Sequence, residues 1–221
     1  MTRKIPPLEP DADACERLAE AARRVILEVR RAAAPAETLD EAAALLERAA
    51  ALLEPHAHPG PFAQSGLDAG RPPGPGFLRG TPAETFPYSP VIGPRNPLAP
   101  PVHCEMRDGE IHARVRFGAP YAGAPQLVHG GVIAAVFDEV LGVLNVMNEQ
   151  GGMTGMLTIK YRAPTPIDQV LRLVGRHERT VGRRVHARGQ LFWGDTLTAE
   201  AEGLFIRVPP GHIALQRGRA R

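Results

Sequence analysis

Residues 132–147 read VIAAVFDEVLGVLNVM, and this apolar run decides the fold of the chain. It contains no proline, and apolar side chains occur on nearly every side of the helix that it predicts, which is typical of a helix buried all round. At about 1.5 Å per residue, this helix would be roughly 24 Å long. A buried helix needs a surrounding layer, which the flanking sequence has to provide.

Alternating polar and apolar side chains predict strands on both sides of this helix. Before it, Asp108-Gly109 is a hairpin turn signal between alternating runs at residues 102–107 and 111–117. The strand-like runs after the helix are residues 153–163, 170–179, 184–193 and 197–208. Their connections are too short for parallel crossovers, so the predicted class is α+β, with a curved antiparallel sheet wrapped around one long central helix.

The first part of the chain is organised differently. Residues 11–55 have apolar side chains at helical spacing with a break at Pro35, which predicts a helical hairpin. Pro and Gly crowd the stretch that follows, which is typical of a linker. The predicted organisation is a hairpin extension at 1–56, a linker at 57–84, the main domain at 85–209 and a basic tail at 210–221.

Charge and composition exclude several classes of function. The 26 Lys and Arg residues nearly balance the 24 Asp and Glu residues, so the net charge of +2 predicts no nucleic-acid surface. Cys15 and Cys104 are the only cysteines and lie far apart, which favours a reducing, cytoplasmic setting without disulfides. No uncharged apolar run reaches ~18 residues, so neither secretion nor membrane spanning is expected. The sequence also predicts no metal and no cofactor.

The segment His129-Gly130-Gly131 stands where a loop turns into the central helix. A helix start presents unpaired N–H groups and the positive end of the helix dipole, and two glycines let a ligand oxygen approach the backbone closely. A thioester carbonyl that becomes an oxyanion needs such donors. The alternative interpretation is that the glycines only permit a tight turn and that His129 is a structural histidine.

Asp138 lies in the middle of this apolar helix, so its carboxylate must reach solvent, find a partner or be desolvated. At roughly 100° per residue it shares a narrow stripe of small or polar residues with Ala135, Gly142 and Asn145, which we expect to face a ligand. Glu139 is the competing acid, although a charge at the sheet edge or in a subunit contact explains it better.

The pattern now includes His129-Gly130-Gly131, Asp138 nine residues after the histidine, and residues 153–164 (MTGMLTIKYRAP) as the next strand. It resembles the hotdog-fold thioesterase superfamily, in particular the phenylacetic-acid-pathway branch that includes the mitochondrial thioesterase superfamily members. The resemblance covers about residues 86–208 and is specific in the helix and the following strand.

The resemblance implies a role for each matching residue. Asp138 would act as general base or nucleophile on a thioester, and the backbone N–H of Gly130 or Gly131 would polarise the carbonyl. His129 would help orient the substrate, and Thr154, sixteen residues beyond the aspartate, would assist the attacking water. Family members are dimers or tetramers with sites shared across the subunit interface.

Family members also bind the CoA phosphates with surface basic residues. The candidates in this sequence are Lys160, Arg162, Arg183 and Arg184. A solvated charge on the face of a strand is the alternative for each of them.

Hydrolysis of acyl-CoA thioesters, without a metal or cofactor, is therefore the predicted function. The main alternative is a non-catalytic acyl-CoA-binding or regulatory protein, because the groups that bind a thioester carbonyl also start its hydrolysis. A hotdog-type hydratase or dehydratase ranks last, because those relatives pair an acid with a histidine in other sequence settings.

Overall fold

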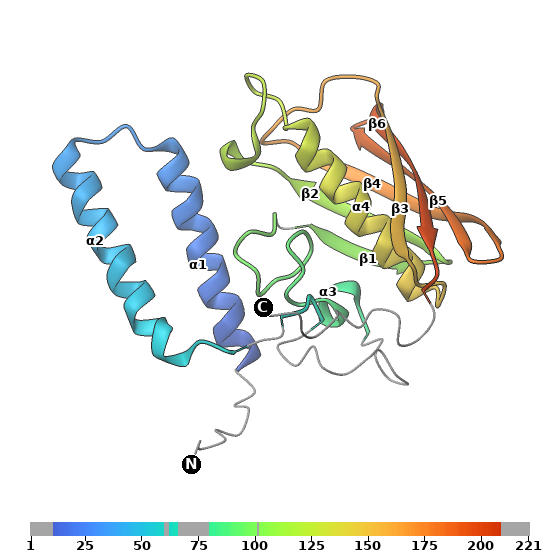
Figure 1. Cartoon of the computed structure of the whole chain (residues 1–221). Helices are drawn as coiled ribbons and strands as arrows, with labels where there is room; N and C mark the ends of the chain where they lie inside the picture. The colour runs from blue at the N-terminus through green and yellow to red at the C-terminus, as the bar shows by residue number, and fades with distance from the viewer. Residues whose placement is uncertain (1–10, 60–61, 66–79, 101, 209–221) are drawn as a thin grey trace, which may run out of the picture.

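A computed structural model describes residues 11–59, 62–65, 80–100 and 102–208 (Figure 1). Its main body is a six-stranded antiparallel sheet with the strand order β1-β2-β4-β5-β6-β3. The strands are β1 (His103–Arg107), β2 (Glu110–Arg116), β3 (Met153–Tyr161), β4 (Val170–Val181), β5 (Arg184–Trp193) and β6 (Thr196–Ile206). The helices are α1 (Ala12–Arg31), α2 (Ala36–Leu53), α3 (Pro82–Thr85) and α4 (Gly130–Met147), with short 3-10 helices η1 (Glu54–His56) and η2 (Ala119–Tyr121).

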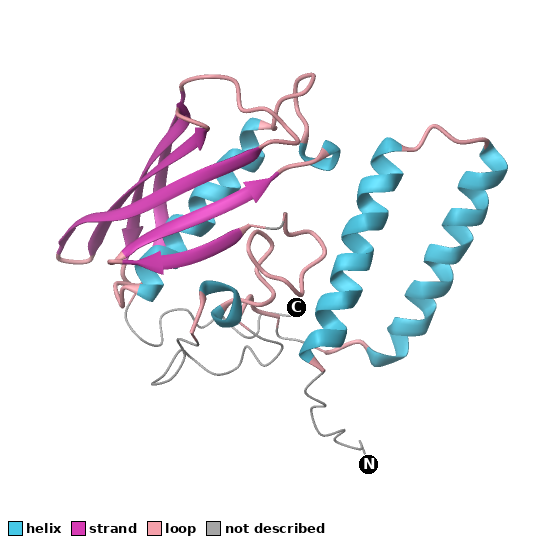
Figure 2. Cartoon of the chain, turned by 180° about the vertical axis from the view of Figure 1, so that it is seen from behind, coloured by secondary structure: helices cyan, strands magenta, loops and turns pink. Residues whose placement is uncertain are grey.

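The sheet curves around α4, which packs against one face of it (Figures 1 and 2). Phe137, Leu141 and Leu144 of α4 are fully buried, and so are the side chains that meet them from the inner face of the sheet. Those sheet residues include Leu171, Leu173, Leu191 and Phe205. The predicted α+β class, a hotdog fold with one central helix, is therefore confirmed.

Two paired glycines let α4 approach the sheet closely. Gly175 of β4 lies opposite Gly189 of β5 in the strand register. A Cβ atom at Gly189 would lie 2.9 Å from the ring of Phe137, and one at Gly175 would lie 3.1 Å from Leu141. Because side chains at these positions would push the helix outward, the two glycines contribute to the tight packing of the core.

The prediction that α4 is buried all round is wrong along one side. Eight of its residues are buried, but Gly131 and Ala135 are exposed, and Asp138 and Gly142 are only partly covered. By length and composition alone α4 could cross a membrane. A core helix meets the same criteria, and the buried face of α4 packs on the sheet.

The predicted helical hairpin is present, with α1 and α2 side by side at one flank of the main body (Figure 2). Asp11 caps α1, because its Oδ1 accepts a hydrogen bond of 2.7 Å from the N–H of Ala14. None of the residues of α2 is buried. The hairpin is therefore attached to the rest of the protein through α1.

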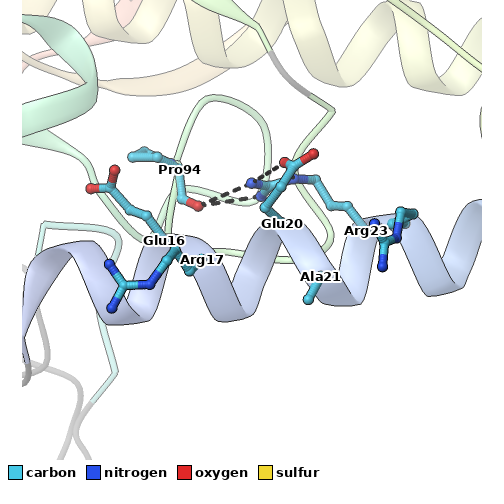
Figure 3. A pocket seen from close by; sticks show the side chains of 7 residues that line it. Glu16, Arg17, Glu20, Ala21, Arg23 and Pro94 are labelled. Atoms are coloured by element: carbon cyan, nitrogen blue, oxygen red, sulfur yellow. Dashed lines mark hydrogen bonds and ion pairs between the residues drawn. The ribbon is translucent and has the colours of Figure 1, made fainter.

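Arg23 forms the polar attachment of α1 to the loop that precedes β1 (Figure 3). Its guanidinium donates to the carbonyl of Asn96 at 3.0 Å and to that of Pro94 at 3.3 Å, and it also pairs with Glu20. The Arg23 side chain is only 16% exposed. Hydrogen bonds from a charged donor to partly buried carbonyls are among the stronger ones, so Arg23 fixes α1 on the main body.

The segment predicted as a linker contains a short helix. Thr81 and Glu84 form a capping box at the start of α3, with each side chain bonded to the backbone of the other residue. Most of the predicted linker and the predicted basic tail lie outside the described residues, so the domain boundaries stay a prediction.

Candidate active site

The first turn of α4 is capped by the imidazole of His129. Its Nδ1 accepts a hydrogen bond of 3.0 Å from the N–H of Gly131, so in the neutral ring the proton is on Nε2. The Gly131 amide is therefore occupied within the chain. In the part of the chain that the structure describes, no acceptor lies on the N–H of Gly130, which leaves this amide as the open donor.

Tyr161 completes the environment of the helix start, and sequence reasoning missed it. Its hydroxyl donates to the carbonyl oxygen of Gly130 at 2.8 Å, which ties the end of β3 to the first residue of α4. A Cβ atom at Gly130 would lie 3.3 Å from the same hydroxyl. Tyr161 stands in the strand that carries the family resemblance, but no local pattern indicated this contact with the helix.

Asp138 and Thr154 lie together between α4 and β3, whereas the role of Thr154 toward the attacking water stays a prediction. The Thr154 hydroxyl donates to Asp138 Oδ1 at 2.7 Å. Asp138 is partly exposed and Thr154 is exposed, so water can reach both side chains. Among the described residues no ion pair involves Asp138, which leaves its charge uncompensated by a cation. A carboxylate held in this way can accept a proton from water or attack a carbonyl carbon.

The desolvated acid of this helix is Glu139 rather than Asp138. Its carboxylate accepts a hydrogen bond of 2.5 Å from Ser89, a residue that is completely buried in the loop preceding β1. Burial raises the pKa of Glu139, and the charge of Asp138 adds to this, although the Ser89 hydrogen bond opposes it. Of the two places expected for Glu139, the sheet edge is wrong, because Glu139 packs under this loop, and the subunit contact stays a prediction.

Cys104 belongs to the same buried group. Desolvation, and then the negative charge of Glu139, raise the pKa of its thiol to about 12. A thiol with such a pKa stays protonated at neutral pH and is a poor nucleophile. Cys104 is thus part of the packing around Glu139.

Asn145 lies at the closed end of the predicted stripe. It is completely buried, and neither the oxygen nor the nitrogen of its amide has a hydrogen-bond partner in the described part of the chain. Gly142, one turn earlier, is partly exposed. The stripe is therefore open at Ala135 and Asp138 and closed at Asn145, whose predicted contact with substrate stays a prediction.

The basic residues predicted to hold the CoA phosphates fall into two pairs, Lys160 with Arg162 and Arg183 with Arg184. The first pair flanks Tyr161 beside the start of α4, and the second lies at the turn between β4 and β5. Lys160 is opposite Glu200 of β6, whereas Arg184 is opposite Ile206. At about 3.4 Å per residue, the two pairs are roughly 20 Å apart, so one subunit does not bring all four together.

The amide of Gly130 and the carboxylate of Asp138 are also separated within one subunit. Asp138 lies eight positions after Gly130 along α4, which corresponds to roughly 12 Å. One thioester cannot contact both groups at this distance. In residues 11–59, 62–65, 80–100 and 102–208 there is also no cluster of His, Cys, Asp or Glu that could hold a metal ion.

Comparison with known proteins identifies the family of this chain. The model of the thioesterase superfamily matches residues 126–200, which include the start of α4, Asp138 and Thr154. Curated relatives are the acyl-coenzyme A thioesterase THEM4 of Xenopus laevis, 36% identical over 94 residues, and that of Bos taurus, 35% identical over 98 residues. These matches cover 41% and 42% of this chain and 42% and 39% of the relatives.

A crystal structure of a thioesterase superfamily protein is similar over a much longer stretch. It is 33% identical, with 90% of this chain and 93% of that chain covered and a TM-score of 0.75. The similarity thus extends beyond the main domain into the N-terminal region. By this relationship, the chain belongs to the thioesterase superfamily.

Proposed function

We propose that the protein hydrolyses acyl-CoA thioesters to a free acid and CoA. The observation that carries this proposal is the 2.7 Å hydrogen bond between Thr154 and Asp138 on the open side of α4. It holds a carboxylate and a hydroxyl together where water can reach them, in the family whose name describes this reaction. The names of the curated relatives support acyl-CoA as the substrate class.

The chemistry follows from these groups. Asp138 takes a proton from water as the water oxygen bonds to the thioester carbon, or the carboxylate itself adds to that carbon. In both routes the carbonyl electrons move to the oxygen, where the N–H of Gly130 stabilises the negative charge. The carbonyl then re-forms, the carbon–sulfur bond breaks and CoA leaves as a thiolate, which is a good leaving group because thiols have a pKa of about 8.5. In the second route the acyl group stays on Asp138 as a mixed anhydride, and water then hydrolyses this anhydride to the free acid and restores the carboxylate.

A homo-oligomer, dimer or tetramer, is part of this proposal. Because Gly130 and Asp138 of one subunit are too far apart for one thioester, the carboxylate of one subunit would work with the amide of another. The outer edge of β3 supports such a contact. It is a sheet edge without a partner strand in the described residues, and Met153 and Met156 on it are 55% and 56% exposed.

Binding of acyl-CoA without hydrolysis is the second candidate. The same separation favours it, since a lone subunit offers a thioester either the Gly130 amide or the Asp138 carboxylate. Hydrolysis therefore requires an oligomer that brings the two groups together, whereas binding alone does not.

The deciding experiment measures thiol release from short-, medium- and long-chain acyl-CoAs, with the oligomeric state determined in the same buffer. Hydrolysis by an oligomer is the expected result. If an oligomeric preparation binds acyl-CoA but releases no thiol from any of them, the hydrolase proposal is wrong and the binding protein remains.

A further inference from the structure

A cavity of about 670 Å³ lies between α1 and the segment that leads into α4. Its walls come from the second half of α1, from η2 and from the ends of β2 and of the turn before β4. Ile26 and Leu27 of α1 and Pro120 of η2 are among its apolar lining residues. The sequence did not indicate this cavity, because its walls are about 90 residues apart in the chain.

The lining of the cavity is positively charged. Four arginines and two acids line it, which gives a net charge of +2. Arg23 is already bound to Glu20 and to two carbonyls, so it is not available to a ligand. The remaining charges are those of Arg24, Arg31 and Arg116, with Asp168 as the remaining acid.

These three arginines are weakly held. Arg24 has no ion pair or hydrogen bond within the described residues. Arg31 is 3.5 Å from Glu28, and Arg116 is 4.0 Å from Asp168, with both arginine side chains more than half exposed. Exposed pairs at such distances contribute little, so these guanidinium groups can turn to an anion at small cost. Guanidinium is always charged and binds phosphate with two parallel hydrogen bonds.

The cavity is next to the helix start of the candidate active site. Tyr121 lines the cavity, and its carbonyl accepts a hydrogen bond of 2.9 Å from the N–H of His129. One further residue step of about 3.8 Å leads to Gly130, so the wall at Tyr121 is roughly 7 Å from the open amide. The pantetheine arm of CoA has a peptide-like backbone as long as about four extended residues, or roughly 15 Å. It can therefore join the two places.

We propose that this cavity binds the 3′-phosphorylated ADP portion of acyl-CoA. The apolar lining residues offer a surface for the adenine ring, and Arg24, Arg31 and Arg116 hold the phosphates. The thioester then lies at Gly130, so the inference rests on the proposed function. It replaces the two separated basic pairs on the sheet, which are roughly 20 Å apart, as the nucleotide site.

The test compares two substrates that share the thioester. Acyl-CoA carries the nucleotide, whereas the matching acyl-N-acetylcysteamine thioester lacks it. The double substitution Arg24→Ala with Arg31→Ala is called the α1 variant. The matched control variant is Arg176→Ala with Arg179→Ala, which removes two exposed arginines of β4. Each lost phosphate contact weakens binding, so the KM for acyl-CoA is expected to rise about tenfold or more in the α1 variant. The turnover of the short thioester and both reactions of the control variant stay at the wild-type level.

Calorimetry with 3′,5′-ADP tests the cavity without turnover. We expect the wild type and the control variant to bind this nucleotide, the α1 variant to bind it at least tenfold more weakly, and the nucleotide to compete with acyl-CoA. Equal 3′,5′-ADP affinity in all three proteins would overturn the inference. Inhibition of the hydrolysis of the short thioester by 3′,5′-ADP, without competition between the nucleotide and acyl-CoA, would overturn it as well, because this result marks a separate effector site. If the wild type hydrolyses neither substrate, the proposed function fails while the calorimetry still decides on the nucleotide site.

Discussion

The substitution Asp138→Asn tests the centre of the proposed mechanism. It keeps the volume of the side chain and an oxygen that accepts from Thr154, but it removes the group that takes a proton or attacks the thioester. Loss of a general base lowers turnover by about 10²- to 10⁴-fold. At about 1.36 kcal/mol for each factor of ten, this is roughly 3 to 5 kcal/mol in the activation barrier.

The effect on folding is much smaller. The Thr154 hydroxyl now donates to a neutral amide instead of a carboxylate, which weakens that hydrogen bond by about 1 kcal/mol. No partner cation is stranded, because Asp138 has no ion pair within the described residues. Since a domain is stable by about 5 to 15 kcal/mol, the variant stays folded.

The assay follows thiol release from acyl-CoA at saturating substrate and, separately, unfolding in urea. The matched control is Asp195→Asn, which removes an exposed carboxylate in the turn between β5 and β6. We expect kcat to fall by at least 10²-fold in the Asp138 variant only, with acyl-CoA still bound. Wild-type turnover in the Asp138 variant would refute the assignment of the acid.

Three further predictions concern contacts that only the structure shows. Glu139→Gln keeps the hydrogen bond from Ser89 but removes a buried charge. Because the pKa of Glu139 is raised in the folded state, the wild type loses stability as the pH rises from the ordinary pKa near 4.5 through the raised folded-state pKa. Urea unfolding across this pH range should show no such loss of stability in the variant. Arg23→Ala removes the charged donor from two carbonyls and should lower the free energy of unfolding by about 2 kcal/mol; an unchanged urea midpoint would contradict this. Tyr161→Phe removes the hydroxyl bond to Gly130 and should cost about 1 kcal/mol in the same measurement, with full stability arguing against that bond.

Local patterns in the sequence were sufficient for the elements and for the fold class, but not for the order of the strands in the sheet. The switch from a helical period in residues 132–147 to a period of two in the flanking runs predicted one core helix and an antiparallel sheet, and all six strands occur close to the expected positions. The break at Pro35 likewise predicted the α1–α2 hairpin. Hydrophobic periodicity is a property of neighbouring residues, which is why it can be read without the tertiary structure.

The sequence also singled out the residues that the proposed mechanism uses, at the start of α4 and at its middle. Glycines after His129 and an acid in an apolar helix are unusual enough to be noticed, and the family resemblance connected Asp138 with Thr154. The sequence could not rank Asp138 and Glu139 by burial. That depends on the loop of Ser89, which is 50 residues away in the chain.

Only the tertiary structure decided which groups are free to act. In the described residues, the Gly131 amide donates to His129, whereas that of Gly130 has no acceptor. Glu139 packs under a loop, and α1 and η2 line a cavity. Each of these outcomes depends on contacts between segments distant in sequence, where packing and desolvation determine whether a polar group is occupied, buried or available. Local propensity carries no information about such contacts, because the same residue has a different hydrogen-bond partner and a different solvent exposure in each possible packing.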